Sequence, residues 1–308
     1  MNTPAVDEAT RLRRLKLPRG KIRMVLDTDT YNEIDDQFAV VHAMLSPDEL
    51  DVEAIYAAPF FNARSANPAD GMEKSYGEIL RLLDRLGITS DGFVFRGAQG
   101  YLRDSSTAQP SAAATDLIDR ATSDHAAPLY VVAIGAITNV ASAILLEPSI
   151  IERIVVVWLG GHAQQWPHTR EFNLMQDVAA SRVVLDCGVP LVRIPCLGVT
   201  SHLTTTVSEI ERFVQGQGSI GDYLARIFRD YRSDHFAWSK ELWDVATIGF
   251  LIDPDWVPTN LVHSPVLSDQ LTWSVDQSRH LVREAFFVRR DPILRDLFTK
   301  LTTRDHRG

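Results

Sequence analysis

The sequence predicts an α/β protein built on an open, mostly parallel sheet flanked by helices, a Rossmann-like core. Two observations predict this class. Short apolar, β-branched runs recur along the chain, and most are followed by a stretch with helical periodicity. Two of the runs, 130–134 and 154–158, are almost continuously apolar, as strands covered on both faces of a parallel sheet must be.

The alternation of strand and helix continues through the first two thirds of the chain. Each apolar run is short enough for a strand, and each periodic stretch is long enough for a helix. The expected strands and the helices after them are, in order, 22–26 and 36–45, 52–57 and 70–86, 129–133 and 139–146, 154–158 and 177–185, and a strand at 191–194.

The last third is predicted to be mainly helical. Residues 200–250 have helical patterning, and the segment 220–231 is clearly amphipathic. A late pair of strands is expected within 270–290, from the runs 272–275 and 285–288, and a closing helix over 292–301.

Composition favours one globular domain with a basic extension. The 308 residues are 45% hydrophobic and 23% charged, and no linker or repeat divides them, so we expect one domain over 22–308. A basic N-terminal arm, 1–21, precedes it. The first 23 residues hold seven cations: Arg11, Arg13, Arg14, Lys16, Arg19, Lys21 and Arg23.

Net charge and cysteine content restrict the partners and the location. Lys and Arg total 31 against 40 Asp and Glu, a net charge of −9 that disfavours a nucleic-acid partner. No apolar run is long enough to cross a bilayer, so no membrane partner is expected. The two cysteines, Cys187 and Cys196, lie in apolar stretches, which favours burial and a reducing, cytoplasmic location.

An acidic cluster follows the first predicted strand. Asp27, Asp29, Glu33, Asp35 and Asp36 lie within ten residues, where an α/β sheet places its ligand crevice. Carboxylates held this close repel one another unless a cation compensates them. Oxygen ligands without Cys or His favour Ca²⁺ or Mg²⁺.

Two other interpretations of this segment stay open. Aspartates are common at helix starts, which accounts for Asp35 and Asp36 but not for Asp27 and Asp29 at the strand end. A strand followed by Asp-x-Asp also resembles the nucleophile motif of haloacid-dehalogenase-like phosphohydrolases. That alternative is a Mg²⁺-dependent phosphohydrolase with Asp27 as its nucleophile, although Tyr31 stands where that motif has Thr or Val.

Four ordered motifs resemble the inosine-uridine-preferring nucleoside hydrolases over about residues 22–250. The resemblance implies their single-domain fold. The motifs are the Asp-x-Asp and Asp-Asp pairs of 27–36, the strand-to-helix turn Gly135-Ala136-Ile137-Thr138-Asn139, the segment Gly160-Gly161 with Arg170-Glu171-Phe172-Asn173 and Asp177, and Trp243-Asp244 at a helix start.

The resemblance implies hydrolysis of the N-glycosidic bond of a ribonucleoside or related riboside, as in purine or pyrimidine salvage. Asp29 would be the catalytic base that activates a Ca²⁺-bound water, and would itself bind the ion. The other implied Ca²⁺ ligands are Asp36, Asp244 and the carbonyl oxygen of Ile134. A homodimer or homotetramer is implied too.

The resemblance also implies which residues contact the ribose of the substrate. Asp35 would bind the sugar, Glu171 and Asn173 would hold its hydroxyls, and Asp27 would support the metal ligands from behind. Such a carboxylate field suits the oxocarbenium-like sugar of glycoside cleavage.

The chain also departs from the family pattern. The loop between the acidic pairs is two residues longer, and Pro59 stands where the family has an asparagine, so Asn62 is expected to substitute for it. Trp243 replaces the family's histidine before the last aspartate. His162, His168 and His235 are the candidates to replace it, and of these His168, together with Trp166 in the same loop before Glu171, is predicted to contact the leaving group. A third hypothesis is a non-catalytic nucleoside- or ribose-binding protein that keeps the metal site.

Overall fold

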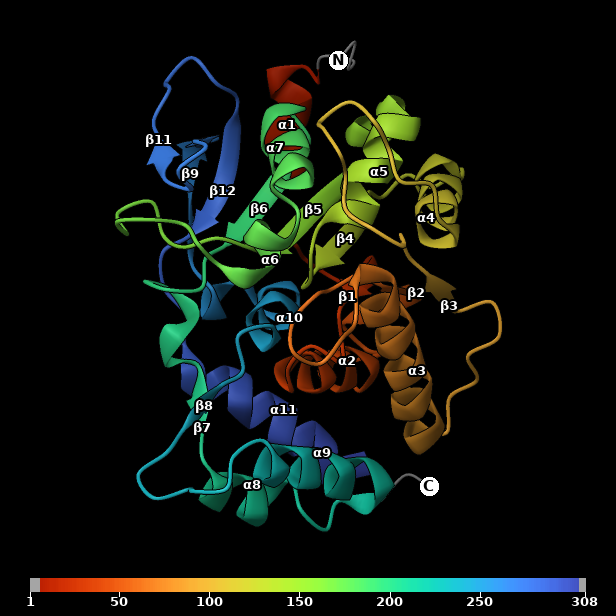
Figure 1. Cartoon of the computed structure of the whole chain (residues 1–308), viewed down its shortest axis with the longest axis vertical. Helices are drawn as coiled ribbons and strands as arrows, with labels where there is room; N and C mark the ends of the chain where they lie inside the picture. Colours follow the sequence, from red (N-terminus) through yellow and green to blue (C-terminus); the bar gives the residue numbers. More distant parts are fainter. Residues whose placement is uncertain (1–5, 305–308) are drawn as a thin grey trace.

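In a computed structural model that describes residues 6–304, the chain folds around an eight-stranded sheet of order β3-β2-β1-β4-β5-β6-β12-β9 (Figure 1). All neighbouring strands are parallel except β12 and β9. The strands are β1 (Ile22–Thr28), β2 (Leu50–Ala57), β3 (Val94–Arg96), β4 (Leu129–Ala133), β5 (Ile154–Leu159), β6 (Leu191–Ile194), β9 (Thr259–His263) and β12 (Leu281–Ala285).

The sheet is covered on both faces because its strands are apolar on both faces. In β1, Met24 and Leu26 pack into one buried cluster, whereas Val25 packs into the other. Helices α2 (Asp35–Met44), α3 (Pro68–Leu86) and α10 (Val245–Ile252) bury residues in the first cluster. Helices α4 (Ala112–Thr122), α5 (Thr138–Leu146) and α7 (Val178–Asp186) bury residues in the second.

Helix boundaries follow ordinary capping chemistry. Asn67 accepts the backbone N–H of Asp70 at the start of α3, Pro68 occupies its first turn, and Gly87 ends it with a φ of 65°. Asp177 likewise caps α7 by accepting the N–H of Ala180. Such caps fix where the loops at the sheet edge begin and end.

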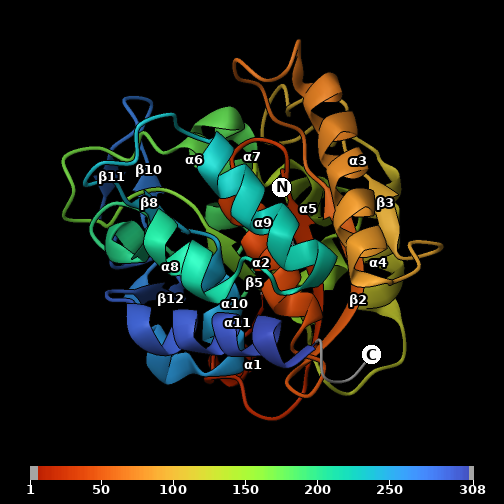
Figure 2. The same ribbon diagram turned by 90° about the horizontal axis from the view of Figure 1, so that it is seen from below.

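The C-terminal helices form a further layer below the first face. Helices α8, α9 and α11 lie together there (Figure 2). Their bounds and those of the remaining elements are α1 (Glu8–Arg14), α6 (Phe172–Gln176), α8 (Val207–Phe213), α9 (Gly218–Asp230), α11 (Arg290–Arg304), β7 (Thr204–Thr205), β8 (Lys240–Glu241), β10 (Val266–Leu267), β11 (Trp273–Ser274), and the 3₁₀ helices Pro148–Glu152, Thr200–His202 and Pro254–Trp256.

The structure confirms the predicted fold class and corrects several elements. Strands β3 and β9 and helix α4 are not predicted from the sequence, and a three-residue edge strand such as β3 leaves almost no pattern. The late strand pair was wrong: β11 pairs with β10, while β12 pairs with β6 and β9 and ends at Ala285. The closing helix, predicted over 292–301, lies within α11. No helix among residues 6–304 is long and apolar enough to cross a membrane.

The described part of the predicted N-terminal arm packs on the domain. Helix α1 lies in it, Leu15 is buried in the main core, and the Arg11 guanidinium donates to the carbonyl oxygen of Gly188 at 3.3 Å. Residues 1–5 of the arm lie outside the described residues. The division into an arm, 1–21, and a domain, 22–308, stays a prediction.

Two glycines of α3 provide a matched test of this packing. A methyl group at Gly71 would overlap the carbonyl oxygen of Phe60, whereas a methyl group at Gly77 meets nothing within 4 Å. We expect Gly71→Ala to lower the free energy of unfolding by about 1–3 kcal/mol through overpacking. Gly77→Ala should raise it by up to about 1 kcal/mol through helix propensity. Urea unfolding measures both, and equal effects of the two substitutions would contradict the packing described.

Candidate active site

The acidic cluster lies between the end of strand β1 and the start of helix α2. Strand β1 ends at Thr28, Asp29 follows it, and a turn leads to Asp35 and Asp36 in the first turn of α2. The carbonyl oxygen of Asp29 accepts the N–H of Asn32 at 2.7 Å, which closes that turn. All three aspartates are almost completely buried.

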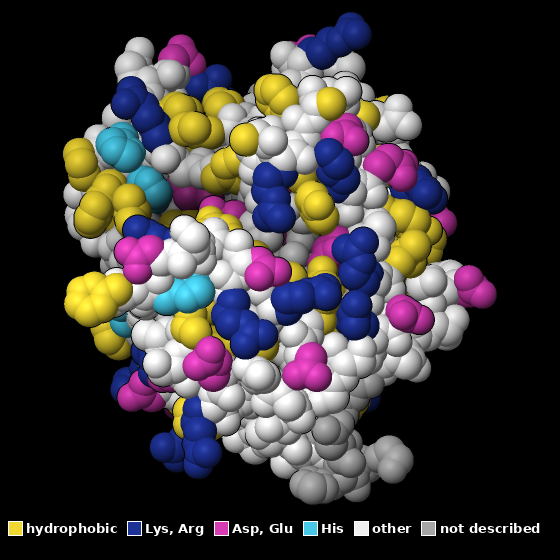
Figure 3. All heavy atoms as spheres, turned by 60° about the horizontal axis from the view of Figure 1, so that its bottom comes forward, with side chains coloured by type: hydrophobic (Ala, Val, Ile, Leu, Met, Phe, Trp, Pro, Cys, Tyr) yellow, Lys and Arg dark blue, Asp and Glu magenta, His cyan; other side chains and the backbone are white. Residues whose placement is uncertain are grey.

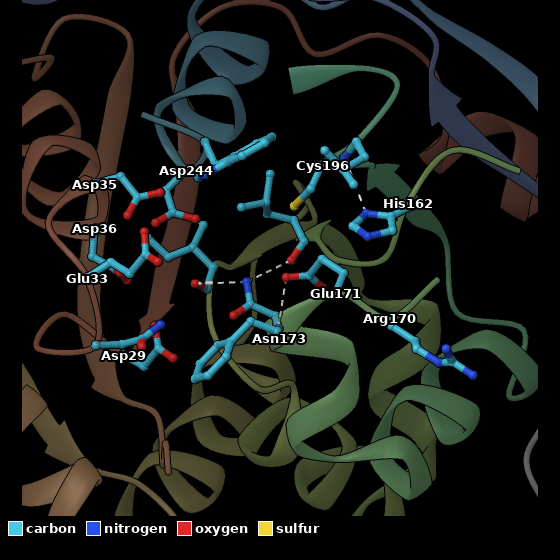
Figure 4. A pocket seen from close by; sticks show the side chains of 16 residues that line it. Asp29, Glu33, Asp35, Asp36, His162, Arg170, Glu171, Asn173, Cys196 and Asp244 are labelled. Atoms are coloured by element: carbon cyan, nitrogen blue, oxygen red, sulfur yellow. Dashed lines mark hydrogen bonds between the residues drawn. The ribbon is translucent and has the colours of Figure 1, made fainter. Parts of the chain in front are cut away.

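A cavity of 330 Å³ opens beside this cluster, at the carboxyl ends of the strands (Figure 4). On the surface, acidic side chains lie in the depth of a hollow (Figure 3). Seven residues predicted for the site line the cavity: Asp29, Asp35, Asp36, Ile134, Glu171, Asn173 and Asp244. Elements distant in sequence therefore converge on one site.

Three carboxylates face one another at one end of the cavity. Asp35, Asp36 and Asp244 each place an oxygen within 4.8 Å of the others. Asp244 is the residue just before α10, and α10 packs beside α2 (Figure 4). Thr28 donates its hydroxyl to Asp36 at 2.5 Å, which fixes that carboxylate.

Asp29 is the most unusual member of the cluster. Its side chain is 0% exposed, and among the described residues neither of its carboxylate oxygens has a hydrogen-bond partner. Gly135 lets the turn after β4 approach closely, because a methyl group there would lie 3.1 Å from the carboxyl carbon of Asp29. That turn also brings the carbonyl of Ile134 to the cavity. Unpartnered buried oxygens beside carboxylates and a carbonyl suit a hard divalent cation.

Burial and mutual repulsion raise the pKa of every carboxyl in the cluster. Burial is the larger cause, and neighbouring carboxylates add to it. The pKa of Asp35 rises to about 6 and that of Asp36 to about 8, and those of Asp29 and Asp244 lie well above their ordinary range.

One lysine partly offsets this negative charge. Lys240, on β8, donates to Glu33 at 2.7 Å and lowers the pKa of Asp35 by its charge. Glu33 itself lines the cavity. Most carboxyl groups of the cluster therefore have no cationic partner among the described residues.

Glu171 and Asn173 are held rigidly at the opposite wall. The Glu171 carboxylate accepts the backbone N–H groups of Gly161, Asn173 and Leu174 at 2.8–3.0 Å, because it caps α6. The amide nitrogen of Asn173 donates to the carbonyl oxygens of Ile134 and Leu159. Its amide oxygen is left to accept a ligand hydroxyl.

The comparisons with known proteins decide the family. A family model described as "Inosine-uridine preferring nucleoside hydrolase" matches residues 24–291. The chain belongs to this family. It is 29% identical over 261 residues to the pyrimidine-specific ribonucleoside hydrolase RihA of Salmonella typhimurium, covering 75% of this chain and 80% of that protein.

Solved structures of nucleoside hydrolases share the fold. A plant nucleoside hydrolase superposes with a TM-score of 0.73 at 20% identity, covering 92% of this chain and 99% of that one. A purine-preferring ribonucleoside hydrolase from Gardnerella vaginalis gives 0.72 at 20% identity, covering 91% and 98%. This nucleoside hydrolase is therefore an N-glycosyl hydrolase that cleaves the N-glycosidic bond of ribonucleosides.

The phosphohydrolase alternative is not favoured in this family, and Asp27 is poorly placed for it. Its side chain is 0% exposed and does not line the cavity. Asn139 donates to it at 2.8 Å, and burial raises its pKa to about 7. A nucleophile must reach its substrate, so this position fits support of the strand end better.

Three residues predicted to contact substrate lie outside the cavity. Asn62 donates its amide to the side chain of Asn32 at 2.6 Å, behind the loop that lines the cavity. Trp166 and His168 both pack on the ring of His162, with centroids 6.5 and 5.5 Å away. The substrate roles of these three residues stay predictions.

His162 is the histidine that lines the cavity. Its backbone carbonyl is fixed by Arg193 at 2.8 Å and by the indole N–H of Trp273 at 2.9 Å. The N–H of Leu197 donates to its Nδ1 at 3.3 Å, which assigns the ring proton to Nε2. Burial lowers its pKa to about 4, so at neutral pH it is an uncharged donor.

Other residues that line the cavity are not among those predicted to bind the metal or the substrate. Trp243 lies next to Asp244, and Glu33 belongs to the extended loop, so both had a signal in the motif. Cys196 and Leu197 follow β6, and the rule that ligand sites form at strand ends would have found them. The full set not chosen is Asn32, Glu33, Leu159, His162, Arg170, Phe172, Cys196, Leu197 and Trp243.

The raised pKa values give a pH dependence for the protein kept in chelator. Folded Asp35 and Asp36 hold their protons to about pH 6 and 8, far above the ordinary pKa of 3.8, so the folded state binds more protons than the unfolded state. The free energy of unfolding should therefore fall as pH rises from about 4 to about 8. Urea unfolding at a series of pH values measures this. A stability that rose over this range, or a slope unchanged in Asp36→Asn, would contradict the description of the cluster.

Proposed function

We propose that Asp29 is the general base of this nucleoside hydrolase and that the site holds Ca²⁺. The proposed ligands are Asp29, Asp36, Asp244 and the carbonyl oxygen of Ile134. One observation carries the proposal: both oxygens of Asp29 are buried without a hydrogen-bond partner, beside three further carboxylates. Such desolvation is unfavourable without a compensating charge, and oxygen ligands of this kind suit Ca²⁺.

A base must be ionised before it can take a proton. Burial and its neighbours raise the pKa of Asp29, so the uncompensated cluster holds protons that catalysis has to remove. When bound, the divalent cation supplies the positive charge that ionises these carboxyls and acidifies water nearby. Asp29 then takes the proton of the attacking water on a carboxylate oxygen that no protein donor occupies.

The remaining residues hold the sugar and stabilise its charge. As the glycosidic bond breaks, the ribose gains oxocarbenium character, which the field of Asp35 and its neighbours stabilises. Asp35 is proposed to accept a ribose hydroxyl. Glu171 and Asn173, pinned by backbone and carbonyl partners, offer fixed oxygens to the other hydroxyls. A site that grips hydroxyls in this way should discriminate strongly against sugars lacking them.

The leaving group meets a different surface from the sugar. Trp243 lies beside Asp244 in the cavity and offers an aromatic face against which a base can stack. His162 can donate a hydrogen bond but is a weak candidate for a charged acid because of its lowered pKa. We therefore propose that base binding depends on stacking and neutral donors.

Assembly and location complete the proposal. We propose that the protein forms a homodimer or homotetramer, as the family resemblance implies. A cytoplasmic location is supported by two cysteines that are buried and unpaired, Cys187 and Cys196.

Separate substitution of Asp29 and Asp27 tests the catalytic assignment. We expect Asp29→Asn to lower kcat by about 10³-fold or more, because the base is lost and the charge with it. Asp27→Asn should lower it less, and Asp51→Asn, at an exposed position of the neighbouring strand β2, should leave it unchanged. Release of reducing sugar from uridine and inosine measures turnover. Phosphate release that depended on Asp27 would contradict the assignment.

Removal of divalent cations tests the metal proposal. Purified protein should contain calcium at near-stoichiometric amount by elemental analysis, and dialysis against a chelator should abolish turnover and lower Tm. Added Ca²⁺ should restore both, and Mg²⁺ should restore them poorly because it requires tighter octahedral geometry. A chelated protein with full activity would refute the metal, and restoration by Mg²⁺ alone would refute calcium.

A further inference from the structure

A second cavity lies at the opposite end of the sheet from the active site. It has a volume of 420 Å³ and lies among the end of α1, the segment leading into β1, and the start of β4. Helix α1 lies at the end where the parallel strands begin, at the top of Figure 1. We call this cavity the amino-end groove. None of its residues lines the active site.

The amino-end groove is strongly cationic although the protein as a whole is acidic. Six cations line it: Arg13, Arg14, Lys16, Arg19, Lys21 and Arg23. Within residues 6–304, Arg23 is the one of these six that forms an ion pair, with Glu53. An adjoining cavity of 260 Å³ shares Arg14 and Arg23 and adds Arg153 and His125, with Glu152 as its acidic residue. The positive charge of the groove is thus largely uncompensated within the described chain.

Arg14 shows this lack of compensation directly. Its guanidinium is partly buried, and its Nε donates to a backbone carbonyl, that of Glu152 at 3.2 Å, rather than to a carboxylate. Burial lowers the pKa of Arg14, and the neighbouring charges of Arg13 and Arg153 lower it further. A bound anion would relieve this repulsion.

Two ordinary explanations account for only part of the charge. Cations in the last turn of a helix interact well with its dipole, which explains Arg13 and Arg14 in α1. Lys16, Arg19 and Lys21 lie beyond the helix and gain nothing from that dipole. The second explanation is that the cations are simply exposed to solvent, but this does not account for the concave shape of the groove.

The floor of the amino-end groove is apolar. Pro18, Ile22 and Tyr130 line it and are buried, whereas Arg13 and Lys16 line it and are exposed. Burial raises the pKa of the Tyr130 phenol, so it stays uncharged. A buried apolar floor beneath exposed cations complements a ligand with one flat apolar part and one multiply charged part.

We propose that the amino-end groove binds a nucleotide, with its phosphates on the cations and its base against Pro18 and Tyr130. Arginine and lysine are the usual partners of phosphate oxygens. The concave shape fits a small ligand better than a membrane surface. The net charge of −9 opposes a long polyanion such as RNA, which would extend beyond the groove onto acidic surface. This binding is independent of the proposed catalytic roles.

Calorimetric titration of the full-length protein with ATP tests the proposal. We expect saturable binding at about 50 mM salt that weakens at about 200 mM salt, as phosphate contacts require. Adenosine and inorganic triphosphate should each bind at least about tenfold more weakly than ATP, because each lacks one half of the ligand.

Charge reversal locates the site. The triple variant Arg13→Glu, Lys16→Glu and Arg19→Glu should weaken ATP binding by about tenfold or more while leaving the rate of nucleoside hydrolysis unchanged. The matched control reverses the same number of exposed cations elsewhere, the three arginines Arg103, Arg212 and Arg232. It changes the net charge equally and should bind ATP nearly as well as the unaltered protein. Unchanged hydrolysis also shows that the groove variant is folded.

Four outcomes would overturn the proposal. These are the absence of ATP binding to the unaltered protein, equal loss of binding in the control variant, binding of inorganic triphosphate as tight as that of ATP, and tighter binding of a single-stranded RNA or an anionic vesicle through the same three cations. The third would show that the apolar floor is not used. The fourth would assign the groove to a polymer or a membrane.

Discussion

The close approach of four buried carboxyls is the constraint on which the rest of this structure depends. Asp29, Asp35, Asp36 and Asp244 share one small cavity, and each would be destabilised there if it were ionised alone. The nearest lysine, Lys240, is engaged with Glu33 and offsets only part of the charge. Without a compensating charge such a cluster favours protonated carboxyls, and a bound cation would favour their ionised form.

The topology of the sheet explains why these groups meet. Strand β1 lies between β2 and β4, so the chain leaves it in one direction and later returns on its other side. Loops on the two sides of such a switch point diverge and leave a crevice at the carboxyl ends of the strands. Asp29 enters that crevice from β1, and Ile134 enters from β4. Glycine at position 135 permits the closeness of these two turns, because a side chain there would press on Asp29.

The same topology shows what the sequence could and could not predict. Asp29, Asp35 and Asp36 are neighbours in sequence, so their pattern alone indicated a cation site. Ile134 and Asp244 are assigned only through the family resemblance. Nothing in the local sequence distinguishes the backbone carbonyl of Ile134, or Asp244, from other carbonyls and aspartates of the chain. Cys196 and Phe172 reach the cavity because β6 ends there and α6 begins there, and that convergence depends on strand order.

The residues predicted to contact substrate that do not line the cavity have a related cause. Asn62 follows β2 closely enough to suggest the cavity, but it bonds Asn32 on the far side of a loop whose path the sequence does not specify. Trp166 and His168 lie in the segment before Glu171 and contact the ring of His162 edge-on or tilted, while His162 itself lines the cavity. The short edge strand β3 and the strand partners of β11 were unpredictable for the same reason, since long-range pairing rather than local preference decides them.

The charge of the molecule is segregated along its strands, which the net value of −9 conceals. The carboxyl ends of the parallel strands all lie at one edge of the sheet. The clustered aspartates Asp29, Asp35, Asp36 and Asp244 lie at that edge. The amino ends gather at the other edge, and there α1 and the segment after it place arginines and lysines. Separated in this way, each edge keeps its own field, because Coulomb interactions weaken with distance and salt screens the exposed cations of the groove beyond about 8 Å. The acidic edge can therefore attract a cation and the basic edge an anion in the same molecule, because the length of the strands separates the two groups of charges.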